Sequence, residues 1–577
     1  MSSYYKLFFV ILLLLSLRSS FAQLALETKQ KYPQDYFRSP LDIPLLLSGT
    51  FGELRPNHFH GGIDIKTQKR EGLNVYAAAD GYVSRINVSG KGYGNALYIT
   101  HPNGYVSVYA HLKSFNWAIK KFLRERQYAE QKNEIDIQVS PDLLPVSKGG
   151  IIALSGNSGG SQAPHLHFEI RDAATEETIN PLLFGFNIID NIAPRIQGTL
   201  LYTFDSEDHP LSRQKITPIK FTDNNETALP LIFVNSPYIA VAVASQDALN
   251  NSDGNNGIYS LMVQKDEATY FTYEMERFRY SHTRCIHAHM DYQYYETGGS
   301  RYHRIFRLPG DMLEAYRNEV NRGIIILNES EISTIAITSD DAHGNKVRVG
   351  FRVKYNGANN NWSPPSYDKI LFWDESNQFY QDDIQCDFGT GLFYEDVLFR
   401  HSTIPSSNNT IYSDIHLVHK DEVPVHTYFD IALRAKNIPM GNEEKAIIIY
   451  EDESGKKLNK GGTWDGVFIR GKAREFGTFY IMIDEKAPVI TPMNVGGGKA
   501  ISNNAILSWK IQDNLSGINS FNLYIDNAWH VLEYDSKTNK VWHTLTGTLS
   551  SGTHTILLVV KDERNNVSEY KSNIQVI

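Results

Sequence analysis

Short segments in which apolar and polar residues alternate, separated by turns rich in Gly, Asn and Asp, make up most of this chain. Ser333–Thr338 and Lys346–Lys354 flank one turn cluster, Asp341–Asn345, and Thr553–Val560 precedes a second, Asp562–Asn566. Alternation with a period of two predicts strands joined as hairpins. Few stretches follow a helical period, and the chain has 33 Tyr and 28 Phe, so the pattern predicts a mainly β protein.

One segment breaks this alternation. Between His111 and Val146, apolar residues recur at helical spacing among basic ones: Trp117, Ile119, Phe122 and Leu123, with Lys120, Lys121, Arg124 and Arg126. This spacing predicts an amphipathic helix within residues 113–145.

The first 22 residues have the features of an export signal. A short start with Lys6 is followed by the apolar run Leu7–Leu17, and Ser20-Phe21-Ala22 offers small residues at the −3 and −1 positions of a cleavage site before Gln23. The run has 11 residues, whereas a membrane-spanning helix needs about 20. We therefore expect a signal peptide over 1–22, no transmembrane segment after its removal, and an exported protein that is periplasmic, on the cell surface or secreted.

The composition argues against some classes of partner and metal site. Without the leader, 54 basic residues face 65 acidic ones, a net charge of −11, which argues against nucleic acid as a partner. Cys285 and Cys386 are too few for a zinc knuckle and lie about 100 residues apart, so we expect them to stay unpaired or to pair only incidentally.

A repeated phrase divides the chain, whose 577 residues suggest about four domains. Ile189–Ile196 and Ile483–Ile490 share an extended Ile-Asp…Ala-Pro pattern, typical of a chain entering a β-sandwich. We predict a domain over 40–190, an immunoglobulin-like sandwich over 193–355, a further β-rich domain over 356–485 and a C-terminal immunoglobulin-like domain over 487–577. The last three offer surfaces for possible protein partners.

The residues that could bind a metal or catalyse a reaction gather in the first of these domains. His165-Leu166-His167-Phe168-Glu169-Ile170 alternates as a strand, so His165 and His167 share a face with Cα atoms about 6.6 Å apart. His60 and Asp64 would lie about 13 Å apart if extended, but Gly61-Gly62 between them readily takes the positive φ that lets the chain bend. With His111, these residues supply one carboxylate and four imidazoles, enough for a three-ligand metal site with an open position.

These motifs carry a specific resemblance. His60-x-x-x-Asp64, Tyr109-Ala110-His111-Leu112 and the later His165-Leu166-His167 stretch follow the order of the lysostaphin/LytM-type M23 zinc endopeptidases, and the match covers about Leu47–Arg171. The resemblance implies an antiparallel β-groove peptidase fold. It also implies that His60, Asp64 and His167 bind one Zn²⁺ per chain, and that His111 and His165 are catalytic.

The resemblance further implies an exported zinc metalloendopeptidase that cuts the peptide crosslinks of bacterial peptidoglycan. Two alternatives stay open: an active zinc peptidase with a protein substrate, and a non-catalytic scaffold or activator of cell-wall hydrolases. Retention of all five site residues argues against the scaffold. The bond cleaved and the division of labour between His111 and His165 are not determined by the sequence.

Other features have more ordinary interpretations. Compact relatives lack the insertion 113–145, which is either a lid over the cleft or a helix packed on the flank of the domain. Glu169 is a tempting general base, but the family does not use it, and we leave it out of the site. Asp247–Gly257 could suggest calcium, yet its oxygen spacing does not fit the D-x-D-x-D-G loop, which favours an ordinary polar loop.

Overall fold

The computed structural model describes residues 32–206, 209–222, 225–252, 254, 256–357, 362–496, 500–547 and 549–577. The predicted signal peptide over 1–22 lies outside them. The described part is mainly β, as the alternating pattern predicts. Among these residues, no helix is both long and apolar enough to cross a membrane.

The first domain is built on a large antiparallel sheet. Its main path runs β1-β4-β13-β8-β7-β6-β10, with β11 also paired to β6 and β14 to β13. A smaller sheet, β5-β12-β9, and the hairpin β2-β3 complete the domain. The strands are β1 (Leu47–Gly49), β2 (Leu54–Arg55), β3 (His58–Phe59), β4 (Ile63–Lys66), β5 (Asn74–Tyr76), β6 (Gly81–Val88), β7 (Asn95–Thr100), β8 (Tyr105–Leu112), β9 (Ser114–Phe115), β10 (Ile135–Gln138), β11 (Pro145–Val146), β12 (Ile151–Leu154), β13 (His165–Asp172) and β14 (Thr178–Ile179), followed by the 3-10 helix η1 (Pro181–Phe184).

The predicted helix is present as α2 (Trp117–Glu130). Asn116 caps its start, where the side-chain oxygen accepts a hydrogen bond of 2.9 Å from the Ile119 amide. Ile119 and Leu123 are buried in the core of the first domain, and β10, later in the same insertion, adds an edge strand to the sheet. The insertion therefore packs on the flank of the domain, which matches the second of the two interpretations.

The next domain is a sandwich of two sheets, β16-β15-β19-β23 with β25, and β17-β27-β26-β20-β21-β24 with β18. Its elements are β15 (Arg195–Phe204), β16 (Pro210–Ile216), β17 (Ile219–Lys220), η2 (Glu226–Ala228), β18 (Leu231–Val234), β19 (Tyr238–Gln246), β20 (Ser260–Lys265), β21 (Ala268–Glu274), β22 (Arg277–Phe278), η3 (Tyr280–Cys285), α3 (Ile286–His289), α4 (Tyr292–Glu296), β23 (His303–Arg304), β24 (Tyr316–Arg317), η4 (Val320–Gly323), β25 (Ile325–Ile326), β26 (Ile332–Asp340) and β27 (Lys346–Tyr355).

This sandwich is fused to the first domain. Its strand β22 pairs with β14 and so extends the large sheet of the first domain. Phe278 on β22 packs against Phe51 and Phe59, with ring centroids 5.3 and 5.8 Å apart. The two domains therefore share a sheet edge and part of a hydrophobic core.

Two further β domains follow. The third stacks sheet β29-β30-β34-β38-β37 on sheet β32-β33-β39-β35-β36 and adds the pair β28-β31. Its elements are β28 (Lys369–Leu371), β29 (Asn377–Tyr380), β30 (Ile384–Phe388), β31 (Val397–Phe399), β32 (His401–Ile404), β33 (Ile415–Val418), β34 (Phe429–Arg434), η5 (Glu443–Lys445), β35 (Ala446–Glu451), β36 (Lys457–Asn459), β37 (Thr463–Trp464), β38 (Phe468–Ala473) and β39 (Gly477–Ile483).

The C-terminal domain stacks sheet β40-β42-β46-β45 on sheet β41-β48-β47-β43-β44. The fully buried Trp509 lies in its core. Its strands are β40 (Val489–Pro492), β41 (Ala500–Ile501), β42 (Ile506–Gln512), β43 (Ile518–Ile525), β44 (Ala528–His530), β45 (Glu533–Asp535), β46 (Lys540–Thr544), β47 (Gly552–Asp562) and β48 (Val567–Val576).

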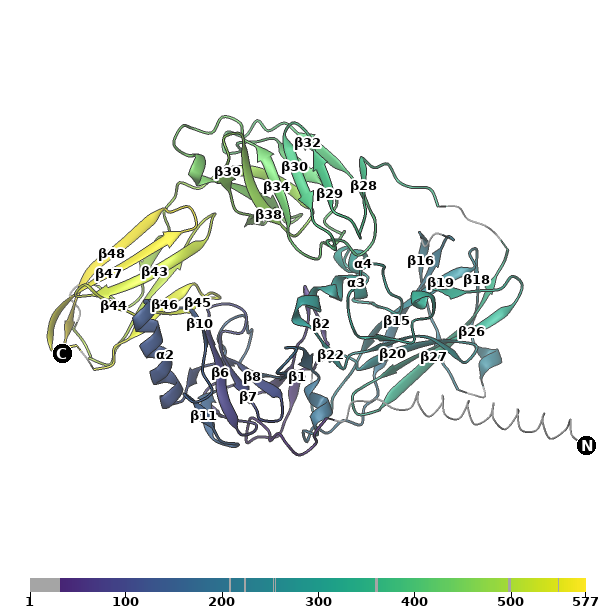
Figure 1. Ribbon diagram of the computed structural model, residues 1–577, viewed down its shortest axis with the longest axis horizontal. Coiled ribbons are helices and arrows are strands. Elements are labelled where there is room, and N and C mark those ends of the chain that lie inside the picture. Colours follow the sequence, from purple (N-terminus) through teal and green to yellow (C-terminus); the bar gives the residue numbers. More distant parts are fainter. Residues whose placement is uncertain are drawn as a thin grey trace, which may run out of the picture.

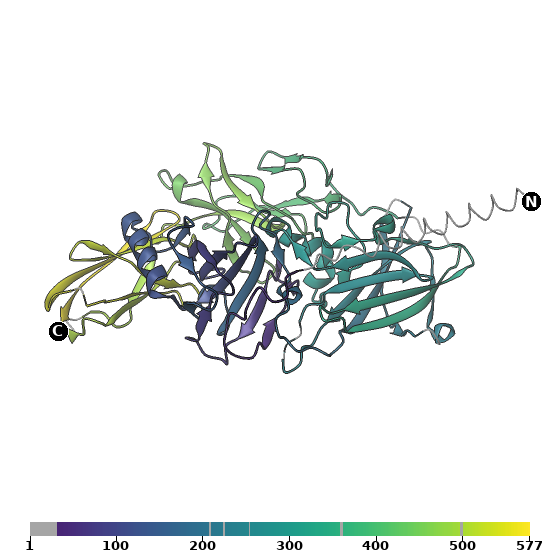
Figure 2. The ribbon, with the colours of Figure 1, turned by 60° about the horizontal axis from the view of Figure 1, so that its bottom comes forward.

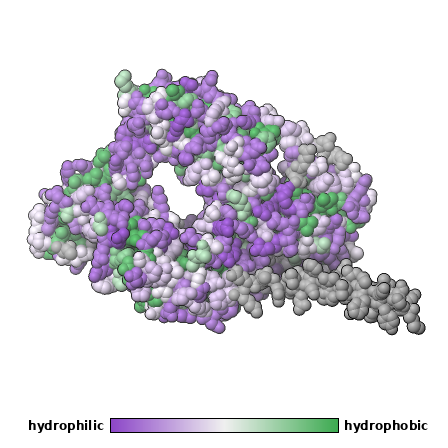
Figure 3. Space-filling model, viewed as in Figure 1, coloured by the Kyte–Doolittle hydropathy of each residue, from purple (hydrophilic) through white to green (hydrophobic). Residues whose placement is uncertain are grey.

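The four domains form a closed ring. Figure 1 shows them arranged around a central opening, and the space-filling view in Figure 3 keeps this opening. In both ribbon views (Figures 1 and 2) the C-terminal domain lies beside α2, so the end of the chain returns to the first domain. Cys285 and Cys386 are buried free thiols in different domains of this ring.

Closure of the ring rests on specific contacts between the insertion and the C-terminal domain. The Asn133 amide donates to the Phe521 carbonyl, and its oxygen accepts from the Leu532 amide, both at 2.6 Å. Arg124 pairs with Glu533 at 2.9 Å, and the rings of Tyr128 and Trp529 meet edge to face at 5.4 Å. The insertion is therefore the docking surface for the C-terminal domain.

We expect Asn133→Ala to loosen this closure, because it removes both hydrogen bonds and leaves the Phe521 carbonyl and Leu532 amide without these partners, at a cost of about 1–3 kcal/mol. Small-angle scattering should show a larger radius of gyration, and limited proteolysis should cut faster near Ile490. Asn573→Ala, at an exposed asparagine of the C-terminal domain, is the control. Equal scattering curves for both variants and the wild type would show that the docking does not depend on Asn133.

We also expect the fold to be acid-labile. Burial lowers the pKa of five buried histidines to about 3 or 4, against 6.5 in an exposed histidine: His287, His303, His416, His426 and His543. Below pH 6.5 the unfolded chain takes up protons that the folded chain excludes. Stability is therefore complete above about pH 6.5 and falls by about 1.4 kcal/mol per pH unit for each histidine as the pH approaches 4.

Calorimetry between pH 7.5 and about pH 4 measures this effect through the unfolding temperature. His543→Gln, which keeps a donor for the Val531 carbonyl, should make the loss shallower for the C-terminal domain. An unfolding temperature that is constant down to about pH 4 would contradict the assignment of these histidines as buried and neutral.

Candidate metal centre

Three neighbouring strands bring the predicted site residues together. β13 lies between β4 and β8, with His167 opposite Asp64 on one side and opposite Ala110, the residue before His111, on the other. His60 follows β3 and begins the segment that leads into β4. Residues from three separate motifs thus meet because of strand pairing.

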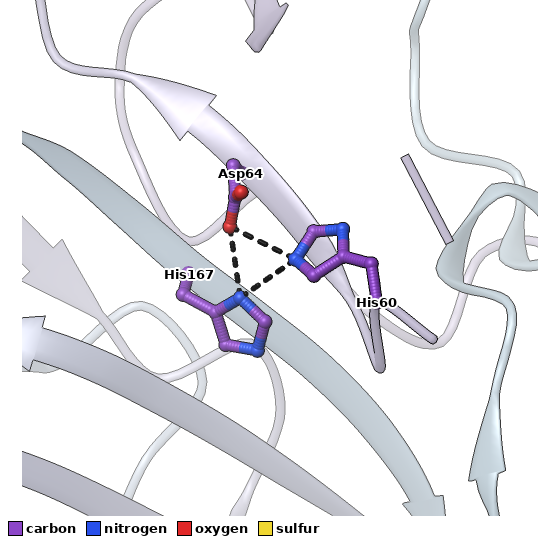
Figure 4. Close-up of side chains that lie close together, drawn as sticks. All are labelled: His60, Asp64 and His167. Carbon is purple, nitrogen blue, oxygen red and sulfur yellow. Dashed lines mark hydrogen bonds and ion pairs between the residues drawn. The ribbon is translucent and has the colours of Figure 1, made fainter. Parts of the chain in front are cut away.

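The donor atoms of His60, Asp64 and His167 converge on one point (Figure 4). His60 Nε2 lies 3.1 Å from Asp64 Oδ1 and 3.0 Å from His167 Nδ1, and the last two atoms are 2.8 Å apart. The three residues are only 2%, 5% and 4% exposed. A tetrahedral ion with ligands at 2.0–2.1 Å would space them by about 3.3 Å, so this donor set fits a small metal ion.

The second polar atom of each of these residues is held by the protein. His60 Nδ1 donates to the Thr50 carbonyl at 2.8 Å, which leaves the lone pair on Nε2. His167 Nε2 contacts Glu169 Oε1 at 2.8 Å, and Asp64 Oδ2 accepts from Arg55 at 2.6 Å. Such partners fix the tautomer and the orientation of metal-binding side chains.

The electrostatics favour a cation at this point. Burial lowers the pKa of His60 to about 4. Burial opposes ionisation of Asp64, but His60, His165 and His167 hold the pKa of its carboxyl well below the usual range. Burial likewise works against a charged His167, yet Asp64 and Glu169 raise its pKa to about 9. Two carboxylates therefore hold one positive charge at His167, and a metal ion can supply that charge.

The bend between His60 and Asp64 has a different cause from the one predicted. Gly61 and Gly62 do not adopt positive φ. A Cβ at Gly62 would lie 2.3 Å from the Phe168 carbonyl oxygen, and one at Gly61 would lie 2.8 Å from the Tyr280 hydroxyl. Glycine is needed here because β13 and the neighbouring domain pack directly on the backbone.

His111 and His165 stand beside the three donors. Their ring centroids are 4.8 Å apart, and His111 lies 5.9 Å from His167. His111 Nδ1 donates to the Ser158 carbonyl at 2.9 Å, and His165 Nδ1 donates to the Ala163 carbonyl at 2.8 Å. Each therefore keeps the lone pair on Nε2, and His165 Nε2 lies 3.4 Å from Asp64 Oδ1.

The backbone at His111 is unusual. Its φ of +58° lies in the left-handed region, which non-glycine residues seldom adopt and which often marks functional sites. Burial lowers the pKa of His111 to about 3, so this imidazole is neutral at physiological pH. Its position suits proton transfer at Nε2.

The loop that carries the Ser158 carbonyl is supported from two sides. A Cβ at Gly159 would lie 2.3 Å from the Gly94 amide nitrogen, so the loop packs directly on the turn before β7. From the C-terminal domain, Lys537 donates to the carbonyls of Asn157 and, at 3.0 Å, Ser161. The last domain of the chain thus reaches the loop that orients His111.

Glu169, which the sequence analysis leaves out of the site as a general base, supports the centre from behind. It is fully buried and contacts the His167 nitrogen that points away from the other donors, so it orients His167 and does not face the open side of the centre. Arg171 donates to Glu169 Oε2 at 2.7 Å, and the hydroxyl of Tyr280, from the second domain, donates to Oε1 at 3.1 Å. The regular alternation of His165, His167 and Glu169 is the signal that could have identified it.

Two further histidines lie outside the centre. His58 is exposed, with its ring bonded to the Pro56 carbonyl. His101 is buried and bridges the Asp80 carbonyl and the Ser107 hydroxyl, a structural role.

Comparison with known proteins identifies two parts of the chain. Residues 58–135 match the model of peptidase family M23, and residues 368–484 match that of a Zu5-like domain. The DD-carboxypeptidase/endopeptidase Mpg of Neisseria meningitidis serogroup B is 34% identical over 123 residues, 21% of this chain and 22% of that protein. An uncharacterized metalloprotease of Haemophilus influenzae is 32% identical over 131 residues, 23% of this chain and 21% of that protein.

Among solved structures, the catalytic domain of lysostaphin from Staphylococcus simulans is similar at 22% identity, over 24% of this chain and 91% of that one, with a TM-score of 0.19. The matches span about a fifth of the length of the curated relatives. The chain contains an M23 peptidase domain, which agrees with the resemblance seen in its motifs.

We expect Glu169→Gln to weaken metal binding by about 10–100-fold, the usual effect of losing a carboxylate partner of a metal-binding histidine. The measurement is competition with a chelator of known affinity. Glu176→Gln, at an exposed glutamate on the turn after β13, should bind metal like the wild type, whereas His60→Ala should retain almost none. Wild-type affinity in Glu169→Gln would show that this carboxylate does not act on the centre.

Proposed function

We propose that this protein is an exported zinc metalloendopeptidase that hydrolyses peptide crosslinks of bacterial peptidoglycan. The observation that carries the proposal is the convergence of His60 Nε2, Asp64 Oδ1 and His167 Nδ1 beside two further imidazoles. Two imidazoles and one carboxylate with room for a water suit zinc better than calcium or magnesium. One zinc ion per chain follows from this single donor set.

A zinc ion held there would act as a Lewis acid, lowering the pKa of a water molecule and polarising a scissile carbonyl. The residues around it suit the accompanying proton transfers. His111 is neutral and can take a proton at Nε2, while its Nδ1 stays bonded to the Ser158 carbonyl. His165, held at Nδ1 by the Ala163 carbonyl, presents Nε2 to the same space and, once that nitrogen is protonated, can donate to a developing oxyanion or a leaving amine.

Two observations support peptidoglycan as the substrate. A relative of the M23 domain is named a DD-carboxypeptidase/endopeptidase, and residues 1–22 have the pattern of an export signal. A protein substrate is the alternative, since the same centre would cut any peptide that enters it. A scaffold without catalysis is disfavoured because the three donors and both imidazoles lie together.

We expect the mature chain to release peptide fragments from purified peptidoglycan, and a zinc chelator to abolish the release. Mass spectrometry of the soluble products identifies the bond, and a panel of folded and unfolded proteins incubated in parallel tests the alternative. His167→Ala is the inactive control. Cleavage confined to the protein panel would replace peptidoglycan with a protein substrate, and no cleavage of either would favour the scaffold.

We expect His111→Ala and His165→Ala to keep zinc and to lose about 10²–10⁴-fold in turnover, the usual contribution of a positioned acid or base. Because both act on one transition state, the double variant should lose less than the product of the single losses. His58→Ala, at an exposed histidine on β3, is the matched control. Loss of zinc from either single variant would make that histidine a metal ligand instead.

A further inference from the structure

Two groups of aspartates outside the metal centre lie at equivalent places in two domains. Asp190 and Asp484 stand in the segments that enter the second and fourth domains, at the repeated Ala-Pro phrase. Asp341 and Asp562 stand at the turns of the long hairpins β26-β27 and β47-β48. Donor atoms of Asp190, Asp341 and His343 lie within 4.8 Å of one another, as do those of Asp484, Asp513 and Asp562.

The hydrogen bonds around the two groups repeat as well. Asn345 donates to the Asp190 carbonyl at 3.3 Å and to Asp341 Oδ2 at 2.8 Å. Asn566 donates to the Asp484 carbonyl at 2.9 Å and to Asp562 Oδ2 at 2.7 Å. An asparagine at the equivalent position thus joins the entry segment to the hairpin in each domain.

A third aspartate follows the corresponding strand in each sandwich. Asp247 directly follows β19, and Asp513 directly follows β42. Asp513 belongs to the second group by distance. Asp247 stands outside the first group by distance, but burial together with the charges of Asp190 and Asp341 raises its pKa to about 7.

Several of these carboxylate oxygens are buried without hydrogen-bond partners. The Asp190 side chain is fully buried, and its Oδ2 has no hydrogen bond, although His343 Nδ1 lies 3.5 Å away. Asp247 is 3% exposed, and its Oδ1 has no partner. Asp513 Oδ1 is likewise buried and unpartnered.

Within the described part of the chain, neither Lys nor Arg forms an ion pair with Asp190, Asp341, Asp484, Asp513 or Asp562. Burying carboxylates side by side without a counter-charge is costly. A hard divalent cation would remove both the repulsion and the unpaired oxygens, and calcium takes its ligands from carboxylate and carbonyl oxygens.

We propose that each group is a calcium site, one at the entry to the second domain and one at the entry to the fourth. Calcium at these points would join the entry segment to the far hairpin of the same sandwich and so stiffen the junction between consecutive domains. Asp247 adds negative charge beside the first site, whereas the sequence predicts an ordinary polar loop over Asp247–Gly257. The donors of that site come from the entry segment and the hairpin, not from a contiguous D-x-D-x-D-G loop.

The test is a calorimetric titration of the full mature chain, zinc-loaded, with calcium chloride at pH 7.5 and up to the roughly 10⁻³ M that extracellular calcium modules require. The wild type should bind two calcium ions. Asp190→Asn and Asp513→Asn, which remove one charge with little change of shape, should each bind one ion, and the double variant none. Calcium should also raise the unfolding temperature and slow proteolysis near Ile196 and Ile490.

Asp452→Asn is the matched control. Asp452 accepts from the amides of Ser454 and Lys456, just as Asp341 accepts from those of His343 and Asn345, but it stands outside both groups. This variant should still bind two ions. Absence of calcium binding in the wild type, as expected if the carboxylates share protons instead, or two bound ions in the double variant would overturn the proposal.

Discussion

The register between β4 and β13 is the constraint on which the metal centre depends. Asp64 lies opposite His167 in that pairing, so one antiparallel ladder sets the distance between two of the three donors. A slip of one residue would turn His167 to the other face of the sheet. Ile63, Ile65, Leu166 and Phe168, the apolar neighbours on the two strands, are all fully buried, and their burial keeps the ladder in register.

Around the donors, buried charged and polar side chains hold the metal-binding side chains in position. Glu169 holds His167, Arg171 and Tyr280 hold Glu169, and Arg55 holds Asp64. Tyr280 belongs to the second domain, whose strand β22 also continues the sheet of the peptidase domain. The centre is therefore not a property of the M23 domain alone, because the next domain completes the layer behind it.

Local motifs were sufficient to predict much of this. His60, Asp64 and His167, with His111 and His165 beside them, could be selected because their short motifs follow the order of the M23 family, and the alternation over His165–Ile170 predicted the strand. Pairing between distant segments leaves no such pattern, which is why β22, the docking of α2 and the part played by Lys537 could not be foreseen. Gly61-Gly62 was recognised as special for the wrong reason, since crowding by Phe168 and Tyr280 is visible only after folding.

Ring closure brings the later domains into contact with the surroundings of the candidate metal centre. A linear string of domains would let the fourth domain move independently of the first, but here the side chain of Lys537 reaches the loop beside His111. The position of Lys537 then depends on how the fourth domain docks on the insertion of the first, through contacts such as those of Asn133 and Arg124. The entries to the second and fourth domains, where Asp190 and Asp484 stand, belong to the same closed ring, so their geometry bears on the loop beside His111 even though both aspartates lie outside the metal centre.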